Sequence, residues 1–324
     1  LLAVSSMQAG IIKVREYPGG VLAIDSGLVR DEMAACYLLE AGDQVAVIEA
    51  GGYHSAGRIL EVLQKRGWER SAVSHVIVTH VHLDHAGGAG RLLQELPNAR
   101  LVVHPYGARH MIDPFKLEAG TRVVFGDEAF DEMYVTLIPI AEERIIIKQE
   151  GDELLVGERR LRFIDTPGHA RHHFCVWDEQ TRGWFSGDTF GLSYRDLDTA
   201  KGPMVFPITT PIQFDPPALR ASVQRLMQAE PECMYMTHFG RVTDTQRLAA
   251  QMTEGVYKLE EIALRHADAP DRTRKIQQEQ KDWLYALCRE HGVTLSDEAL
   301  GTVVWDDIVL NTQGLEYWLD HRTP

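Results

Sequence analysis

The segment VIVTHVHLDHAGGAG, residues 76–90, places three histidines and one aspartate within six positions. His80 and His82 follow an apolar run that predicts a strand, and their alternate spacing points both imidazoles to the same side, where they can bind one ion together. Asp84 and His85 come where the strand should give way to a turn, so their side chains can reach a second position nearby. The spacing predicts a site for two metal ions about 3.5 to 4 Å apart.

Further metal donors are needed, because two ligands per ion rarely make a catalytic site. His169 lies in IDTPGHARHH, Asp188 in WFSGDTF and His238 in MYMTHFGR. Each of these residues follows an apolar, strand-like run and lies in or beside a turn that contains glycine. Imidazole and carboxylate ligands suit zinc, and also iron or manganese.

The ordered motifs HxHxDH, TPGHxxxH, SGD and THFG resemble those of the metallo-β-lactamase superfamily, over residues 20–245. The resemblance implies an α/β fold, a four-layer αβ/βα sandwich of two mixed β-sheets flanked by helices, with the site at one edge between the sheets. It also implies two divalent metal ions, with zinc first and iron or manganese as alternatives. The implied ligands are His80, His82 and His169 for one ion, Asp84, His85 and His238 for the other, and Asp188 as the bridge.

The chemistry implied by the resemblance is hydrolysis, in which a hydroxide bridging the ions attacks the carbonyl of a small ester, thioester or lactone. Asp84 is then a catalytic candidate for moving a proton. Tyr194 is a second candidate, because a tyrosine donates to the oxyanion in the related lactonases. The alternative is an iron-dependent oxidoreductase of the persulfide dioxygenase kind, and a β-lactamase or a nuclease fits less well.

Two residues beside the expected ligands have two interpretations each. Glu49 in VAVIEAGG stands where the family often has an aspartate, and it is either an acceptor for a ligand histidine or a turn carboxylate. His173, four residues after His169, is either a partner of a ligand or a hydrogen-bonding residue at the start of a strand.

Helical and strand patterns alternate along most of the chain, as an α/β layered fold requires. Residues 56–68 predict an amphipathic helix, which leads into a strand at 75–79. The proline-rich segment 189–214 predicts a loop that covers the active site. Its side chains Phe190, Tyr194, Met204 and Phe206 either line a pocket or anchor the loop.

The end of the chain is predicted to be helical throughout. Asp215 should cap a helix that starts at Pro216. The pattern beyond residue 245 places a domain boundary there, with a catalytic domain at 1–245 and a C-terminal helical subdomain at 246–324.

The composition limits the partners of the chain. Among 324 residues, 33 are Lys or Arg and 47 are Asp or Glu, for a net charge of −14. This balance disfavours nucleic acid and anionic membranes, so we expect a small-molecule substrate, with a homodimer as a compatible assembly. The four cysteines form no CxxC, which favours a cytoplasmic location. The apolar start at residues 1–4 is too short for a signal peptide or a membrane span.

Overall fold

The strands of the protein form two mixed sheets in a computed structural model that describes residues 11–209 and 212–322. The first sheet has the strand order β1-β2-β3-β4-β5-β6-β7 and the second β13-β12-β11-β10-β9-β8. The strands of the first sheet are β1 (Val14–Tyr17), β2 (Val21–Asp25), β3 (Ala35–Ala41), β4 (Gln44–Ile48), β5 (Val73–Ile77), β6 (Arg100–Val103) and β7 (Ile145–Ile147). Those of the second sheet are β8 (Glu153–Val156), β9 (Arg159–Asp165), β10 (Phe174–Asp178), β11 (Gly183–Gly187), β12 (Cys233–Met236) and β13 (Gly240–Val242).

The helices lie outside the two sheets. They are α1 (Ser55–Lys65), α2 (Leu83–Ala86), α3 (Ala89–Glu95), α4 (Pro105–Ile112), α5 (Phe115–Phe125), α6 (Asp127–Met133), α7 (Pro216–Met227), α8 (Thr245–Arg265), α9 (Arg272–His291) and α10 (Asp297–His321). Short 3-10 turns occur at Arg70–Ala72, Glu142–Arg144 and Arg195–Leu197. Within the described ranges, no helix combines the length and the apolar character that crossing a membrane requires.

Strand direction in the first sheet follows from its connections. β1 to β4 pair antiparallel, whereas β4 to β7 pair parallel. Parallel neighbours need a crossover connection, and α1 and α3 supply two of them. The carboxyl ends of β4, β5 and β6 therefore lie at the same edge of the sheet.

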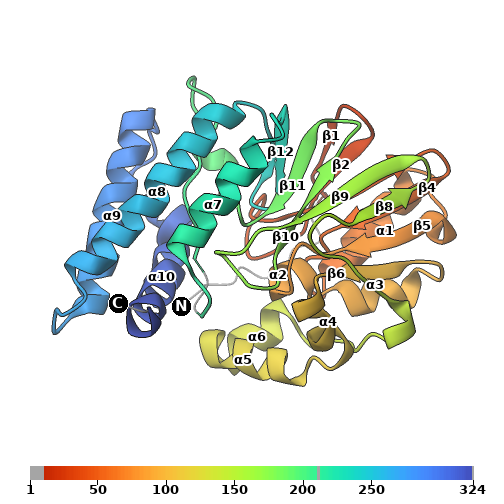
Figure 1. Cartoon of the computed structure of the whole chain (residues 1–324), viewed down its shortest axis with the longest axis horizontal. Helices are drawn as coiled ribbons and strands as arrows, with labels where there is room; N and C mark the ends of the chain where they lie inside the picture. Colours follow the sequence, from red (N-terminus) through yellow and green to blue (C-terminus); the bar gives the residue numbers. More distant parts are fainter. Residues whose placement is uncertain (1–10, 210–211, 323–324) are drawn as a thin grey trace.

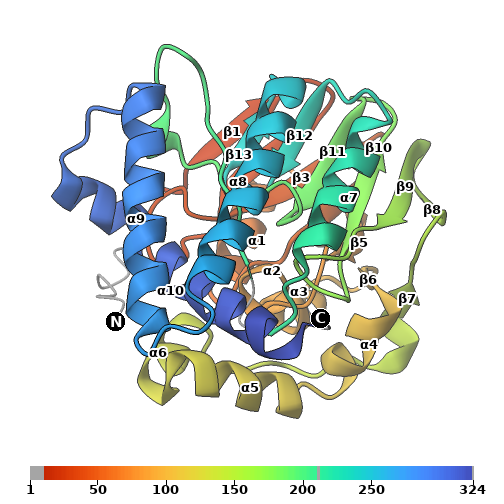
Figure 2. The ribbon, with the colours of Figure 1, turned by 60° about the vertical axis from the view of Figure 1, so that its left-hand side comes forward.

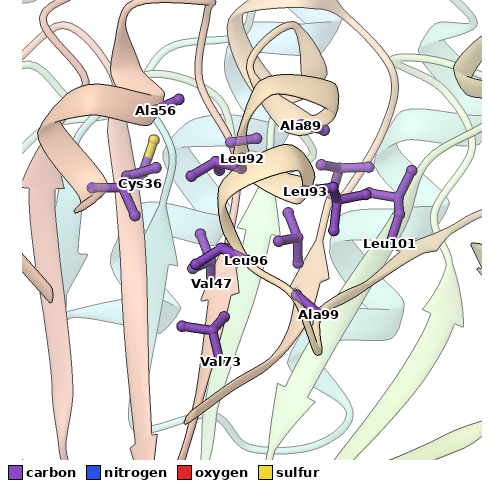
Figure 3. Packing of buried hydrophobic residues seen from close by; sticks show 14 of the residues in the cluster. Cys36, Val47, Ala56, Val73, Ala89, Leu92, Leu93, Leu96, Ala99 and Leu101 are labelled. Carbon is purple, nitrogen blue, oxygen red and sulfur yellow. The ribbon is translucent and has the colours of Figure 1, made fainter. Parts of the chain in front are cut away.

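Three apolar clusters separate the four layers of the sandwich. Tyr37 of the first sheet packs with Phe163 and Phe185 of the second in the layer between the sheets. The outer face of the first sheet packs against α1 and α3, and Figure 3 shows Leu92 of α3 and Leu96, the residue after this helix, in this cluster. The outer face of the second sheet packs against α7 and α8, which run side by side in Figures 1 and 2. The predicted αβ/βα sandwich is confirmed.

Several local predictions are confirmed. α1 overlaps most of the helix expected at 56–68, beginning one residue earlier and ending at Lys65, and it buries Ile59 and Leu63 against the sheet. Asp215 caps α7, accepting a hydrogen bond from the backbone N–H of Ala218 at 3.0 Å. The helices α5 and α6 were not predicted, and α5 contains no buried residue.

Residues 189–209 of the predicted loop pack against the C-terminal helices. Tyr194, Met204 and Phe206 are buried in one cluster with Leu284 of α9 and Ile308 of α10. Phe190 is buried in the cluster beneath α7 and α8. These three loop positions 190, 204 and 206 thus act as anchors, which was one of their two interpretations.

The predicted domain boundary falls where α8 begins, at Thr245. Leu248, Met252 and Val256 of α8 share a core with Trp184 of β11. The boundary therefore stays a prediction about sequence regions, and the hydrophobic packing is continuous across it. The apolar start at residues 1–4 lies outside the described residues.

Candidate metal centre

The seven expected ligands come together at the carboxyl ends of strands from both sheets. After β5 the backbone bends at Thr79 and His80 and reaches His82, an extended residue that precedes α2. The ligands are His80 and His82 after β5, Asp84 and His85 in α2, His169 between β9 and β10, Asp188 after β11, and His238 between β12 and β13.

Four of these side chains form a first group. His80, His82, His169 and Asp188 each offer one atom within 4.8 Å of the others. His82 Nδ1 lies 2.7 Å from His80 Nε2 and 3.2 Å from His169 Nε2. Asp188 Oδ2 lies 3.2 Å from His169 Nε2 and 3.9 Å from His80 Nε2. Three imidazole nitrogens and one carboxylate oxygen thus converge on one point.

The second group faces the other oxygen of Asp188. Asp84 Oδ2 lies 3.3 Å from His238 Nε2 and 3.5 Å from His85 Nε2. Asp188 Oδ1 lies 3.3 Å from His85 Nε2 and 3.6 Å from His238 Nε2. One carboxylate therefore presents one oxygen to each group, which is the geometry of a bridge between two cations.

Two buried atoms indicate that a cation belongs here. His85 Nε2 and Asp188 Oδ1 are both buried, and neither has a hydrogen-bond partner among the described residues. His85 Nδ1 lies 3.1 Å from the Glu49 carboxylate and can donate to it, so Nε2 is the ring atom that faces the second group. Nε2 and Asp188 Oδ1 face each other at 3.3 Å, and a positive charge between them, whether a proton or a metal ion, would satisfy both. The residues present fit a metal ion.

The histidines of the two groups differ in the direction in which their pKa values are shifted. Burial, together with neighbouring imidazoles, holds the pKa of His80 and of His82 well below its usual value. Both are therefore neutral, the form that binds a metal. Burial also lowers the pKa of His85, but the carboxylates of Asp188 and Asp84 outweigh it and raise this pKa well above its ordinary value. The second group thus has a field that attracts positive charge.

Glu49 holds the second group in place. Its carboxylate accepts hydrogen bonds from the Thr79 backbone N–H at 3.2 Å, the Thr79 hydroxyl at 2.5 Å and the Thr237 hydroxyl at 3.2 Å. It also accepts from His85 Nδ1 at 3.1 Å, as an acceptor for a ligand histidine would. The backbone φ of Glu49 is +64°, a costly conformation for a residue other than glycine.

Replacing Glu49 with glutamine should weaken metal binding by about 10- to 100-fold, the usual cost of losing a partner of a ligand histidine. The amide is a weaker acceptor for His85 Nδ1–H, so the ring loses its fixed orientation. Titration with zinc against a chromophoric chelator measures the effect. Glu40→Gln is the matched control, because Glu40 accepts from Trp68 Nε1 at 2.9 Å and contacts none of the ligands. Equal affinities of the two variants would contradict the role of Glu49.

His173 contacts Asp188, the residue expected to bridge the two ions. Its Nε2 accepts a hydrogen bond from the backbone N–H of Asp188 at 3.2 Å, and its Nδ1 lies 2.8 Å from the Thr166 hydroxyl. The partner interpretation is the one that this geometry favours. The signal for it in the sequence was the four-residue spacing from His169.

Backbone carbonyls orient two further ligands. His238 Nδ1 lies 2.8 Å from the carbonyl oxygen of Met33, and His169 Nδ1 lies 3.3 Å from that of Ile208. Sequence reasoning did not find Met33, Ile208, Thr79 or Thr237, because backbone carbonyls and hydroxyls carry no motif.

The expected contribution of Tyr194 to an oxyanion stays a prediction. In the structure its side chain is buried and its hydroxyl donates to Asp307 Oδ1 at 3.2 Å. The Arg30 guanidinium carbon lies 4.3 Å from the centre of its ring. Burial raises the pKa of this phenol well above its ordinary value, so the hydroxyl stays protonated.

The family model of the metallo-beta-lactamase superfamily matches residues 29–238, which include all seven ligands. The chain belongs to the metallo-β-lactamase superfamily. The metallo-beta-lactamase fold-containing protein ST1585 of Sulfurisphaera tokodaii is 27% identical over 229 residues, or 69% of this chain and 80% of that protein. Its crystal structure superposes with a TM-score of 0.64 at 23% identity, covering 91% of this chain and 98% of that one.

Two relatives with named activities match over shorter stretches. A hydroxyacylglutathione hydrolase of Methylococcus capsulatus is 31% identical over 134 residues, or 41% of this chain and 39% of that enzyme. The human acyl-coenzyme A thioesterase MBLAC2 is 28% identical over 171 residues, or 48% of this chain and 57% of that enzyme. Each match thus leaves a large part of the relative uncovered.

Proposed function

We propose that this member of the superfamily is a dinuclear metal-dependent hydrolase that acts on the carbonyl of a small ester, thioester or lactone. The observation that carries the proposal is the division of the Asp188 carboxylate, which directs one oxygen to each of two ligand groups. Zinc is the expected metal, with iron or manganese as alternatives. A small molecule, and neither nucleic acid nor a membrane, is the proposed partner.

Metal ions bound by these groups would polarise a substrate carbonyl and bring the pKa of a bound water near neutrality. The protein's own contribution is to fix the ligands and to accept a proton. Asp84 suits the second task, because its side chain is 23% exposed whereas that of Asp188 is 5% exposed. Asp84 is thus the ligand carboxylate that a substrate can reach, and Asp188 is kept for bridging.

Thioesters are the first bond class to test. The two relatives with named activities support this choice, since one is a hydroxyacylglutathione hydrolase and the other an acyl-coenzyme A thioesterase. The neutral imidazoles of the first group and the carboxylates of the second suit hydrolysis of any activated carbonyl, so lactones and esters stay in the proposal.

The test is a panel of thioesters, lactones, esters and β-lactams, assayed with metal-free protein and with protein loaded with zinc, manganese or iron. We expect about two equivalents of metal per chain, and hydrolysis of at least one carbonyl class that a chelator abolishes and metal restores. Loaded protein that hydrolyses none of them would contradict the proposal. Oxygen uptake with a persulfide substrate by the iron form alone would identify the oxidoreductase instead.

A further inference from the structure

We propose that Asn311, in the C-terminal helix α10, is a positioning residue for the metal centre. It fixes the segment Pro207–Thr209, whose central carbonyl orients the ligand His169. The inference rests on the metal centre of the proposed function. It assigns a role to a residue that lies more than 60 positions beyond the last ligand, as the residue numbers of His238 and Asn311 show.

The side-chain amide of Asn311 forms hydrogen bonds with the backbone on both sides of Ile208. Its Oδ1 accepts a hydrogen bond from the backbone N–H of Thr209 at 2.7 Å, and its Nδ2 donates to the carbonyl of Pro207 at 3.1 Å. The Thr209 hydroxyl donates to the backbone carbonyl of Asn311 at 3.2 Å. Asn311 is only 5% exposed, so water cannot readily replace these bonds.

The carbonyl held between these contacts belongs to Ile208. Its oxygen lies 3.3 Å from His169 Nδ1, which donates to it. That donation leaves the lone pair of the ring on Nε2, which faces His82 Nδ1 at 3.2 Å and Asp188 Oδ2 at 3.2 Å. A shift of the carbonyl would therefore change both the tautomer and the orientation of the ligand ring.

The surrounding helices leave the segment little other freedom. Pro207 packs on Gly255 of α8, where an added Cβ would lie 2.7 Å from the proline Cδ. Ile208 is buried in the same cluster as Val304 and Ile308 of α10. Asn311 lies three residues after Ile308, on the same side of the helix, and completes the attachment with directional bonds.

The first ligand group therefore depends on the C-terminal helices. A chain that ended near residue 245 would retain all seven expected ligands. It would lose the hydrogen bonds from Asn311 that hold the Ile208 carbonyl, which orients His169. The helical end of this protein thus contributes to the metal centre from outside the part that supplies the ligands.

The experiment compares Asn311→Ala with Thr312→Val in the full chain. Thr312 is the next residue of α10, fully buried, and its hydroxyl accepts from Gln280 Nε2 at 2.8 Å without touching the 207–209 segment. Each variant removes two buried side-chain hydrogen bonds, so both should lower the melting temperature. The measurements are zinc affinity against a chromophoric chelator and the visible spectrum of the cobalt-loaded protein, which reports ligand geometry.

We expect Asn311→Ala to bind zinc about tenfold more weakly, which is the lower end of the 10- to 100-fold loss of affinity that follows when a partner of a ligand is disturbed. Its cobalt spectrum should also differ from that of the unsubstituted chain. Thr312→Val should match the unsubstituted chain in both. Asn311→Leu removes both bonds but keeps the volume of the side chain, so it should weaken zinc binding as Asn311→Ala does, and it replaces the alanine variant if that one does not fold.

Unchanged zinc affinity and an unchanged cobalt spectrum in both Asn311 variants would overturn the inference. Equal losses in Asn311→Ala and Thr312→Val would also overturn it, because the effect would then be general destabilisation. An unsubstituted chain that binds no metal would overturn the inference and the proposed function together. A chain that binds metal but hydrolyses nothing on the panel would count against the function alone.

Discussion

Asp188→Ala should abolish hydrolysis and weaken metal binding in both groups. Asp188 Oδ2 belongs to the first group and Oδ1 to the second, so one substitution removes a ligand from each. Losing a mere partner of a ligand costs roughly 10- to 100-fold in affinity or activity, and we expect the loss of the shared ligand to exceed that range. Metal content after dialysis and turnover on the best substrate of the panel measure the two effects.

Asp84→Ala is the comparison that isolates bridging. Asp84 belongs to the second group only, with its carboxylate 3.3 Å from His238 Nε2 and 3.5 Å from His85 Nε2. That variant should retain about one equivalent of metal, bound by His80, His82, His169 and Asp188. If Asp188→Ala also retained one tightly bound equivalent, Asp188 would be a ligand of a single ion and the bridging geometry would have no function.

The candidate site was accessible from the sequence because its ligands have distinctive side chains in a fixed order. His80, His82 and His85 stand close together in the chain, and His169 and His238 each follow a strand-like run. The structure brings all seven expected ligands to one edge between the sheets. Which oxygen of Asp188 faces which group could not be inferred, since it depends on the rotamer that Asp188 adopts after β11.

The partners of the ligands were harder to predict. Glu49 and His173 were recognised as candidates with two interpretations each, because a carboxylate or an imidazole can serve in many settings. The carbonyls of Met33 and Ile208 had no signal at all, since every residue has one. Their roles depend on how distant segments pack, and no local pattern encodes that.

Helices that bury one apolar face could be predicted from the periodicity of apolar residues in the sequence. α1 and α7 bury apolar residues against the sheets, and each was predicted. α5 buries none of its residues, so its sequence lacks the apolar stripe on which such a prediction depends. The 189–214 segment was expected to cover the site. Its apolar side chains pack against residues of α9 and α10 that lie nearly a hundred positions further along the chain, so the local sequence does not show these contacts.

Gly168→Ala should lower both the stability of the fold and the affinity for metal. Gly168 precedes His169 and has a φ of +126°, and a Cβ at this position would lie 2.2 Å from the backbone nitrogen of Leu219 in α7. Its carbonyl also accepts from the backbone N–H of Asp215 at 2.8 Å, at the start of that helix. Overpacking costs about 1–3 kcal/mol, and a φ of +126° costs a residue other than glycine about 1–3 kcal/mol, so we expect a loss of roughly 3 kcal/mol.

Denaturant unfolding of the metal-free protein measures this loss, and Gly42→Ala separates its two causes. Gly42 has a φ of +64°, and an added Cβ there meets no atom within 4 Å. The control should therefore lose only the conformational part, about 1–2 kcal/mol, and should bind zinc as the unsubstituted chain does. Gly168→Ala should bind zinc more weakly as well, because the backbone must move away from α7 and takes His169 with it. Equal losses of stability in the two variants would show that the turn and α7 can separate without cost, and that their close approach does not fix the ligand.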